Sequence, residues 1–586
     1  MLIFLLLITL LAIGACLHLV MHTRKSKVSK STLCTLLVIA LVIPNLAVQP
    51  LHGEAVGESI PNPANHLVSA MQTFLQIQAE VDQRLLAYLD SGVHTFNNPA
   101  VVLNPYGVSS LTALALFVSS EPMNISVHVQ GRCELTSVDF TFDGYNTRHE
   151  IPIFGLYAGQ LNTVILTGVT RGGTTQTTTL EIHTAPLPPQ FAKDIIQTNL
   201  IQPENYQPGF NFTWFTKAAF DVNGEHRWIY EGFPTTQVTL YDYNGHMIFK
   251  VSPQGLIQGP PLWRAESVLM FEINKLGRIF NVWHTPHGFC HDLTVASNGN
   301  FIVLGHNGDT IEDFIYEIDV NTGEIVNSLD LKRVLQRTRA VVPYFNPSNW
   351  FHHNSIEYRD GSIIISGRHQ HAIVKMSWPQ GEIEWILSDH TGWHSLFHQH
   401  LLTPIGDNFE WFYGQHTPTI LPNLDGNPDI IDLLLLDNGF ARFYNDRELQ
   451  RAIALGEEVE PENCSRMVHY RINTLDRTVE QIWEWGREKG EVLFADTRSS
   501  ALMLENGNKL GVFDISTHGI STTVSAFFAE VDALGNTIWE AFATDTSDRG
   551  VFFAYRTARL PLYTSAANHM GIGTIPRVLI PEYLLQ

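Results

Sequence analysis

Half of the chain's 26 histidines lie between His284 and His416, in less than a quarter of its 586 residues. Several stand where short apolar strands are predicted to begin, in three similar phrases: Cys290-His291-Asp292, His352-His353-Asn354 and Gln415-His416-Thr417. A neutral imidazole can act near pH 7 as a nucleophile, a proton carrier or a metal ligand. One histidine at a strand start is usually only a hydrogen-bonding residue, so it is the repetition of the phrase that predicts a site.

Arg368 and Asn354 stand among these histidines and narrow the chemistry. A guanidinium binds an oxyanion through paired, charge-assisted hydrogen bonds, whereas it repels a metal ion. Two other groups have spacings that would suit zinc or copper: His394, His398 and His400, and His369 with His371. The set around Arg368 lacks a clear carboxylate ligand, so an anionic substrate with several oxygens fits it better than a metal ion.

The elements that must hold these residues repeat along the chain. An apolar strand, a turn with glycine and a strand often closed by tryptophan recur, as in DVNGEHRWIY at 221, PQGEIEWIL at 379 and DALGNTIWEAF at 532. A spacing of about fifty to sixty residues predicts the four-stranded meanders of a β-propeller, with roughly six blades over residues 200–586. Equivalent positions in different blades lie on one face of a propeller, so we expect the three histidine phrases to converge.

Three segments precede the predicted propeller. Residues 1–50 hold two apolar runs around a basic segment, which indicates a transmembrane hairpin, a lipidation site at Cys16, or a signal peptide that starts at Met21. We prefer the signal peptide, because the second run is short for a span and the first lacks a basic start. Residues 60–95 predict an amphipathic helix with Gln78 as one polar interruption, and residues 96–190 predict a β-sandwich. The predicted fold is therefore all-β: a six-bladed β-propeller preceded by a small β-sandwich and a short N-terminal helix.

Composition excludes some classes of function. The net charge is −22, and four basic residues lie in the leader, so a basic face for nucleic acid is not expected. Beyond the leader, Cys133, Cys290 and Cys464 are far apart and form no CxxC motif. This excludes a redox motif or a zinc knuckle, and an odd count leaves at least one thiol unpaired.

Several phrases together carry a resemblance to a known family. They are NPYGVSSLTALALF and IPIFGLYAG in the predicted sandwich, and NWFHHNSIEY, SGRHQHAIVKM, WILSDHTGW and QHTPTIL in the predicted propeller. In this order they resemble the bacterial arylsulfate sulfotransferases, which move sulfuryl groups without the nucleotide donor PAPS. The resemblance implies a periplasmic enzyme, often a homodimer, that needs no cofactor. It also implies an aryl sulfate donor and a phenolic acceptor. From the leader itself, contact with a membrane is expected only if residues 1–50 stay uncleaved.

The resemblance also implies roles for individual residues. His416, in the QHT phrase, would take the sulfuryl group as a covalent sulfohistidine and pass it to the acceptor. Arg368, His291 and His352 would complete the catalytic set, with either histidine as the general acid and base. Three further residues are candidates for substrate binding: Asn354, His353, which stands where a smaller residue is expected, and Thr497, for the threonine that lines the site in the family. The chain departs from some relatives by lacking a close-spaced cysteine pair.

Two other functions stay open on the residues alone. A propeller can be a non-catalytic binding module, because a fold does not fix a function. The histidine spacings also allow a metal-dependent hydrolase, which a chelator would inactivate.

Overall fold

The computed structural model describes residues 63–213, 217–233, 236–251, 268–308, 310–339, 347–423, 426–440, 442, 455, 463–515, 525–545 and 554–582. The predicted leader, residues 1–50, lies outside them. Residues 62–586 form one compact unit. Among the described helices, none combines the length and the apolar character that a membrane span requires.

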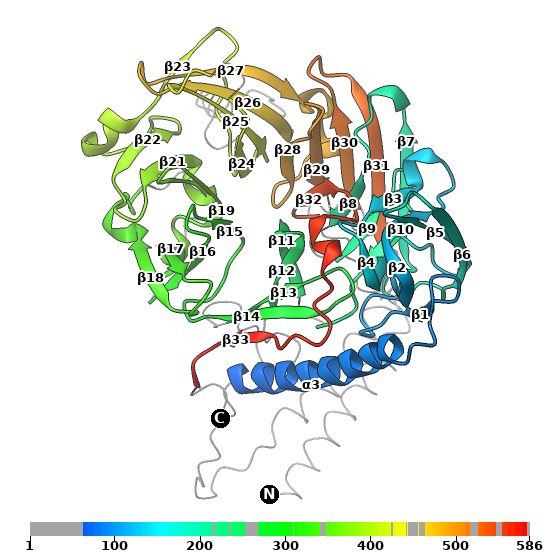
Figure 1. Ribbon diagram of the computed structural model, residues 1–586. Coiled ribbons are helices and arrows are strands. Elements are labelled where there is room, and N and C mark those ends of the chain that lie inside the picture. The colour runs from blue at the N-terminus through cyan, green and yellow to red at the C-terminus, as the bar shows by residue number, and fades with distance from the viewer. Residues whose placement is uncertain are drawn as a thin grey trace, which may run out of the picture. The chain divides into compact units, whose positions relative to one another are not determined.

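Six sheets stand around a ring, each with one edge strand toward the centre (Figure 1). Three sheets, from the central strand outward, are β11 (Thr236–Tyr243), β12 (His246–Val251), β13 (Val268–Ile273), β14 (Ile279–Thr285) and β33 (Arg577–Leu579); β15 (Leu293–Val295), β16 (Phe301–Asn307), β17 (Thr310–Ile318) and β18 (Ile325–Asp330); and β19 (His353–Arg359), β20 (Ser362–Gly367), β21 (Ala372–Ser377) and β22 (Ile383–Leu387). The other three are β24 (His416–Ile420), β25 (Ile430–Asp437), β26 (Arg466–Asn473), β27 (Thr478–Trp485) and β23 (Thr403–Ile405); β28 (Ser500–Met503), β29 (Lys509–Asp514), β30 (Ser525–Val531), β31 (Thr537–Asp545) and β7 (Asp194–Leu200); and β32 (Thr557–Leu560), β8 (Phe210–Thr213), β9 (Ala218–Phe220) and β10 (His226–Ile229). The predicted six-bladed propeller is confirmed.

Strands from the two ends of the chain close the ring. β7 is the outermost strand of the blade formed by β28 to β31, pairing antiparallel with β31 from Asp194 to Leu200. β32, near the C-terminus, is the central strand of the blade that contains β8. Ladder hydrogen bonds between sequence-distant strands therefore hold the ring together. The propeller already begins at Asp194, before the predicted start at residue 200.

Apolar contact between neighbouring blades forms the core of the propeller. All six residues of β20 are buried, as expected for a strand covered on both faces. Ile364 and Ile373 of one blade pack in the same cluster as Leu433 and Leu435 of the next. Trp385, which closes the repeat at residue 379, lies in this cluster too, so the repeated tryptophan serves as packing between blades.

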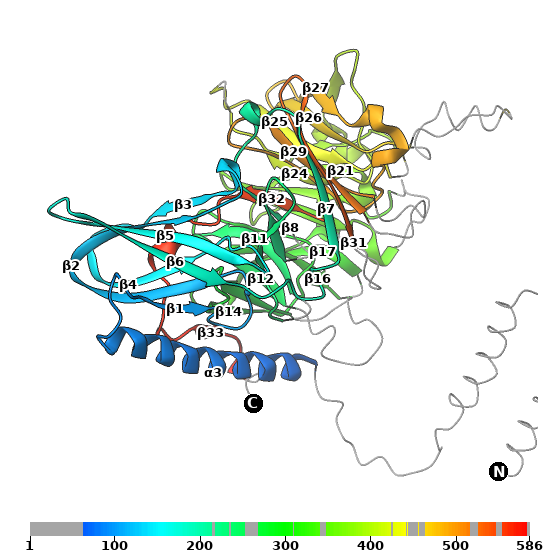
Figure 2. The same ribbon diagram turned by 90° about the vertical axis from the view of Figure 1, so that its right-hand side faces the viewer.

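The sandwich is built around one long strand, β2 (Ala113–Val129). Its first part pairs with β1 (Ala100–Leu103) and β4 (Asn146–Ile153), and its second part pairs with β3 (Val138–Thr141) and β5 (Leu161–Thr170). β6 (Thr175–His183) extends the sheet beside β5. A single strand thus contributes to both halves of the domain, which lies beside the propeller (Figure 2).

The predicted helix is α3 (Pro63–Asp90), and it packs against its own chain. Its apolar stripe joins a core shared with the sandwich and the blade of β11 to β14. The polar interruption in the stripe, Gln78, is buried and makes both hydrogen bonds to the backbone of Ile279, donating to the carbonyl at 3.0 Å and accepting from the N–H at 2.7 Å. Nearby, Asp82 pairs with the buried Arg278 at 2.8 Å. These contacts fix the helix in one register on the propeller.

Candidate active site

The candidate residues meet at one end of the ring, where the central strands begin. His352 directly precedes β19, His416 is the first residue of β24, and His291 and Tyr555 lie just before β15 and β32. His291 and His352 both have a left-handed backbone, with φ of 54° and 53°. Such a conformation is unfavourable for residues other than glycine and is found where a site constrains the chain. Four blades therefore each supply a side chain to the same place.

The ring of His416 is held from behind by a neutral amide. Its Nδ1 lies 2.6 Å from Oδ1 of Asn438, just after β25. The amide nitrogen of Asn438 donates to the carbonyls of Ala495 and Arg498, at 2.7 and 2.9 Å, so its oxygen must be the atom that faces the histidine. An amide oxygen can only accept, which places the hydrogen of His416 on Nδ1 and leaves the lone pair on Nε2.

Electrostatics keep this imidazole neutral. Burial, together with the charge of Arg368, lowers the pKa of His416 well below its usual 6.5, and the hydrogen bond that His416 donates to Asn438 offsets this only in part. A neutral imidazole with a free nitrogen is a nucleophile at physiological pH. The described geometry gives His416 this character.

Arg368 is buried in the site, where burial lowers the pKa of its guanidinium and the nearby charges of Asp496 and Glu312 act against this. Arg556 pairs with Asp292 and Arg498 with Asp514, whereas Arg368 makes no ion pair among the described residues. It donates to the carbonyl of Asp496 at 3.0 Å, and its Nη1 lies 3.1 Å from His369 Nε2. Its Nε is buried with no hydrogen-bond partner within the described part of the chain. A buried guanidinium with an unused donor is suited to bind an anion.

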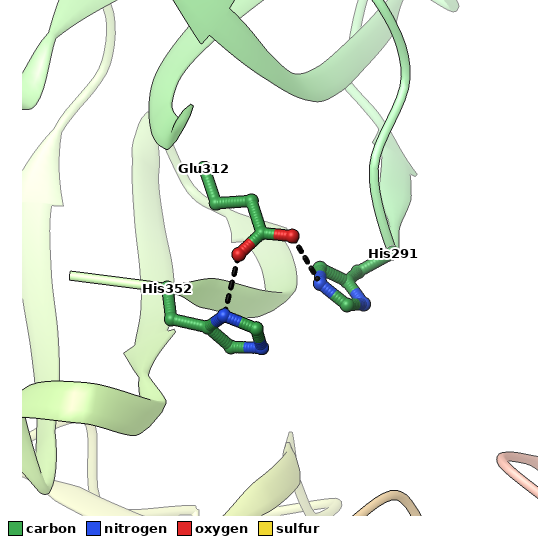
Figure 3. A group of neighbouring side chains, drawn as sticks. All are labelled: His291, Glu312 and His352. Carbon is green, nitrogen blue, oxygen red and sulfur yellow. Dashed lines mark hydrogen bonds and ion pairs between the residues drawn. The ribbon is translucent and has the colours of Figure 1, made fainter. Parts of the chain in front are cut away.

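His291 and His352 share one carboxylate, that of Glu312 (Figure 3). His291 Nε2 lies 3.0 Å from Oε1 of Glu312, and His352 Nδ1 contacts Oε2. Asn349 donates a further hydrogen bond to Oε2 at 2.7 Å. The two imidazoles hold the pKa of this carboxyl well below its usual value although burial acts against them. Glu312 is therefore ionised.

Ring contacts join these groups into one cluster. Tyr555 stacks on His291 with a centroid separation of 5.8 Å and meets the ring of His416 edge-on at 5.4 Å. The ring of His291 lies 5.0 Å from that of His352, which in turn lies 4.4 Å from His369. Because His369 contacts Arg368, the chain of contacts runs from His416 to the guanidinium of Arg368.

The structure assigns the remaining predicted residues different places. Asn354 is buried and donates to the carbonyl of Gln415 at 2.8 Å, which fixes the backbone before His416. His353 is fully buried, and its Nε2 lies 3.2 Å from both Cys290 Sγ and the carbonyl of Gly305. It therefore lies in the core beneath the cluster and does not face solvent.

Thr497 lies in the segment whose carbonyls accept hydrogen bonds from Arg368 and Asn438. The neighbouring carbonyls of Asp496 and Arg498 accept from Arg368 and Asn438. Thr497 itself is partly exposed beside them. Of the described cysteines, Cys133 is a free, exposed thiol and Cys290 a free, buried one, and Cys464 is buried.

One group of described side chains has three potential metal-ligand atoms close together: His291, Glu312 and His352. In the present arrangement each carboxylate oxygen accepts from a different imidazole, and Asn349 also donates to Oε2. The oxygens are therefore used by N–H donors, and the trio is a hydrogen-bonded bridge. The histidines 394, 398 and 400 belong to no such group among the described residues.

A cavity of about 460 Å³ lies along the central strands. Its lining includes Asp292, Thr417 and Arg556, the residues that follow His291, His416 and Tyr555. This volume is within the range of small-molecule sites. The lining hydroxyl groups of Ser355 and Ser500 make the cavity partly polar.

Sequence reasoning missed Glu312, Asn438 and Tyr555. Asn438 had a weak signal, because it stands in a polar step after the apolar run LLLL of β25. Glu312 is one of several acids within a predicted strand, and nothing local separates it from the others. Tyr555 does not lie in a sequence motif that indicates a role in the site. Only spatial proximity to the histidines identifies these two.

Comparison with known proteins agrees with this geometry. Residues 196–552 match a family model described as arylsulfotransferase (ASST), and residues 100–185 match one described as arylsulfotransferase Ig-like domain. The chain is 25% identical over 538 residues to the arylsulfate sulfotransferase AssT of Escherichia coli O6:H1, covering 72% of this chain and 85% of that protein. It is 23% identical over 509 residues to AssT of Lelliottia amnigena, covering 67% and 80%.

Solved structures are more distant in sequence. A putative 6-phosphogluconolactonase from Bacteroides fragilis aligns with a TM-score of 0.27 at 8% identity, covering 75% of this chain and 96% of that one. The Dos1 propeller aligns with a TM-score of 0.24 at 10% identity, covering 52% and 56%. Scores this low carry no argument about function.

Proposed function

This chain belongs to the arylsulfotransferase family, and from that premise we propose that it moves a sulfuryl group from an aryl sulfate ester to a phenol through a covalent intermediate on His416, without PAPS. Membership makes it an enzyme of the arylsulfate sulfotransferase type, with aryl sulfates and phenols as substrates. The covalent route rests on one observation above all: the 2.6 Å contact between His416 Nδ1 and the fixed amide oxygen of Asn438.

In the first step the lone pair on His416 Nε2 attacks sulfur. The nitrogen–sulfur bond forms as the bond between sulfur and the aryl oxygen breaks, and the aryl oxygen leaves as a phenolate that takes a proton from His291 or His352. The Nδ1 hydrogen stays on the ring, because Asn438 Oδ1 accepts the hydrogen bond but cannot take the proton. The sulfuryl group is therefore carried on an imidazolium, which is a good leaving group for the next step.

In the second step a phenol replaces the departed aryl group. The same histidine removes its proton, the phenol oxygen attacks sulfur, and the nitrogen–sulfur bond breaks with its electron pair returning to Nε2. Transfer of this kind depends on holding the oxygens and matching their charge. Arg368 supports that role, because it is buried and charged, forms no ion pair among the described residues, and has an unused Nε–H donor.

The test is a transfer assay with purified protein, 4-nitrophenyl sulfate and 1-naphthol, in EDTA and without PAPS. Intact-mass analysis after donor alone should find one added sulfuryl group, localised to His416 by digestion at neutral pH. His416→Ala should fold and lose both the adduct and the transfer. A His416→Ala protein that transfers at the wild-type rate would refute the covalent route. Activity restored only by added zinc would favour a metal-dependent hydrolase instead.

We also propose that the chain is exported to the periplasm by its N-terminal leader. The support is the order of basic segment and apolar run in residues 1–50, which lie outside the described residues. Fractionation of expressing cells, with intact-mass analysis of the purified protein, tests this. Recovery of the whole chain in the cytoplasmic fraction would contradict the proposal.

A further inference from the structure

The carboxylate of Glu312 lies within the proposed active site, and the mechanism above gives it no task. We propose that Glu312 is a positioning residue that makes His352, and not His291, the proton carrier of sulfuryl transfer. This inference rests on the proposed function and concerns only the histidine that moves the proton.

A β-bulge directs Glu312 toward the cluster. Between β16 and β17 the pairing shifts from Gly305↔Phe314 to Asn307↔Thr310. The single residue between these pairs on β16 therefore lies opposite residues 311–313 on β17. Glu312 lies in this irregular stretch with a φ of 58°, and its N–H donates to Nδ1 of His306 at 2.9 Å. Bulges are frequent beside active sites because they redirect a side chain. His291, Glu312 and His352 all have left-handed backbones, so every member of the bridge is held in a constrained conformation.

The bridge fixes the position of the hydrogen on each imidazole. An ionised carboxylate only accepts hydrogen bonds, so each ring nitrogen that contacts Glu312 must carry a hydrogen. His352 therefore has its hydrogen on Nδ1, and Nε2 carries the lone pair. Asn349 Nδ2 also lies 3.0 Å from that Nδ1, and both N–H groups converge on Oε2.

His291 differs from His352 because both of its ring nitrogens face other side chains of the protein. Nε2 contacts Glu312 at 3.0 Å, and Nδ1 lies 3.3 Å from the hydroxyl of Tyr555. The same hydroxyl donates to the carbonyl of Asn354 at 3.0 Å, which anchors it. His352 Nε2 has no such partner among the described residues. A proton carrier must reach the substrate with a nitrogen that no protein side chain faces, and of these two histidines only His352 has one among the described residues.

The two proposed reactive imidazoles are supported by opposite kinds of partner. The neutral amide of Asn438 accepts the hydrogen bond from His416 Nδ1, which suits a nucleophile that must not gain a proton. A carboxylate backs His352, which suits a base that must hold a positive charge when it takes the phenol's proton, since an opposite charge favours the protonated form. In the acceptor step the phenol hydrogen moves to His352 Nε2 while the phenol oxygen bonds to sulfur. In the donor step the same hydrogen moves from Nε2 to the leaving oxygen.

Several charged or titratable groups face His352: Glu312, His291, His369, Arg368 and His416. Burial, His291 and Arg368 lower the pKa of His352, and Glu312 acts against them. The bound donor adds a negative charge and so favours protonation of the histidine as the leaving group needs it. Without Glu312 the base would be weaker, and its pKa would fall further.

The experiment separates the two half-reactions in Glu312→Gln, with Glu317→Gln as the matched loss of a buried carboxylate on the same strand. Sulfurylation of His416 by 4-nitrophenyl sulfate should stay near the wild-type rate, because this acidic phenol leaves without a proton. Transfer to 1-naphthol should fall by about 100-fold, and its acidic limb should move to lower pH. Glu312→Asp keeps the charge, so it should restore part of the transfer rate to 1-naphthol and part of the pH profile. Glu317→Gln should match the wild type in both half-reactions.

Single variants of the two histidines give a second test that does not depend on Glu312→Gln folding. His352→Gln should abolish the acidic limb in the pH–rate profile of the acceptor step. His291→Gln should slow the acceptor step but keep this acidic limb. The opposite result, or a Glu312→Gln enzyme with the wild-type acceptor rate and pH profile, would overturn the inference. A wild-type enzyme that forms no adduct would instead refute the proposed function.

Discussion

The amide of Asn438 offers the sharpest test of how the nucleophile is prepared. In Asn438→Ala, His416 Nδ1 loses its 2.6 Å acceptor inside a buried site, and the described residues offer this nitrogen no second acceptor. A buried polar group left without its partner costs about 1–3 kcal/mol. If that energy is what favours the reactive tautomer, sulfurylation should slow by about 5- to 160-fold.

The assay is single-turnover formation of the sulfuryl adduct from 4-nitrophenyl sulfate, followed by release of the phenolate. The donor concentration at half-saturation should stay as in the wild type, because Arg368 keeps its contact with the carbonyl of Asp496. Asn162→Ala is the matched control, since its buried amide also donates to backbone carbonyls, but within the sandwich. It should lose stability and keep the wild-type rate.

The result that refutes this reasoning is a folded Asn438→Ala enzyme that forms the adduct at the wild-type rate. In that case the tautomer of His416 would not depend on the amide, and the contact would be only structural. An adduct on another residue would refute it equally, because the lone pair at His416 Nε2 would not be the attacking group.

Three further changes have definite expected outcomes. Arg368→Lys should reduce kcat/KM by about 100-fold, because one ammonium cannot replace a forked donor worth about 3 kcal/mol in the transition state. Steady-state kinetics with an aryl sulfate measures this reduction. A change below threefold would count against anion binding by Arg368. Gln78→Ala should lower the free energy of unfolding by about 2 kcal/mol and leave kcat unchanged, because it removes two hydrogen bonds far from the site; denaturant titration measures this. The protein should lose stability as pH falls from about 6.5 toward 4, because burial lowers the pKa of His149, His284 and His306 to about 4, so the unfolded chain binds protons there that the folded chain does not. His284→Gln should flatten the fall of melting temperature with pH, and an unchanged slope would contradict the assignment.

Local pattern was sufficient for most of the architecture. Strand length, turn glycines and the recurring tryptophans predicted six blades, because each blade is a contiguous meander whose pairing is largely set by neighbours in the sequence. The repeat pattern did not predict how the ring closes, because β7 and β32 join blades whose other strands are far away in the chain. It also left Gln78 as an interruption in an apolar stripe, whereas the structure gives its amide two backbone partners on another element.

The sequence by itself determined which reactive residue types recur and that they stand at strand starts, so His416, His352, His291 and Arg368 could be named from spacing and resemblance. Only the tertiary structure decided their chemical states. The tautomer of an imidazole depends on the atom facing each nitrogen, and those atoms belong to Asn438 and Glu312, which lie 22 and 40 residues from the histidines they support. Tertiary packing likewise moved His353 into the core, because its ring contacts Cys290 across 63 residues of chain. Residue spacing can place side chains on a common face, but charge, burial and hydrogen-bond partners follow from contacts that the linear pattern does not contain.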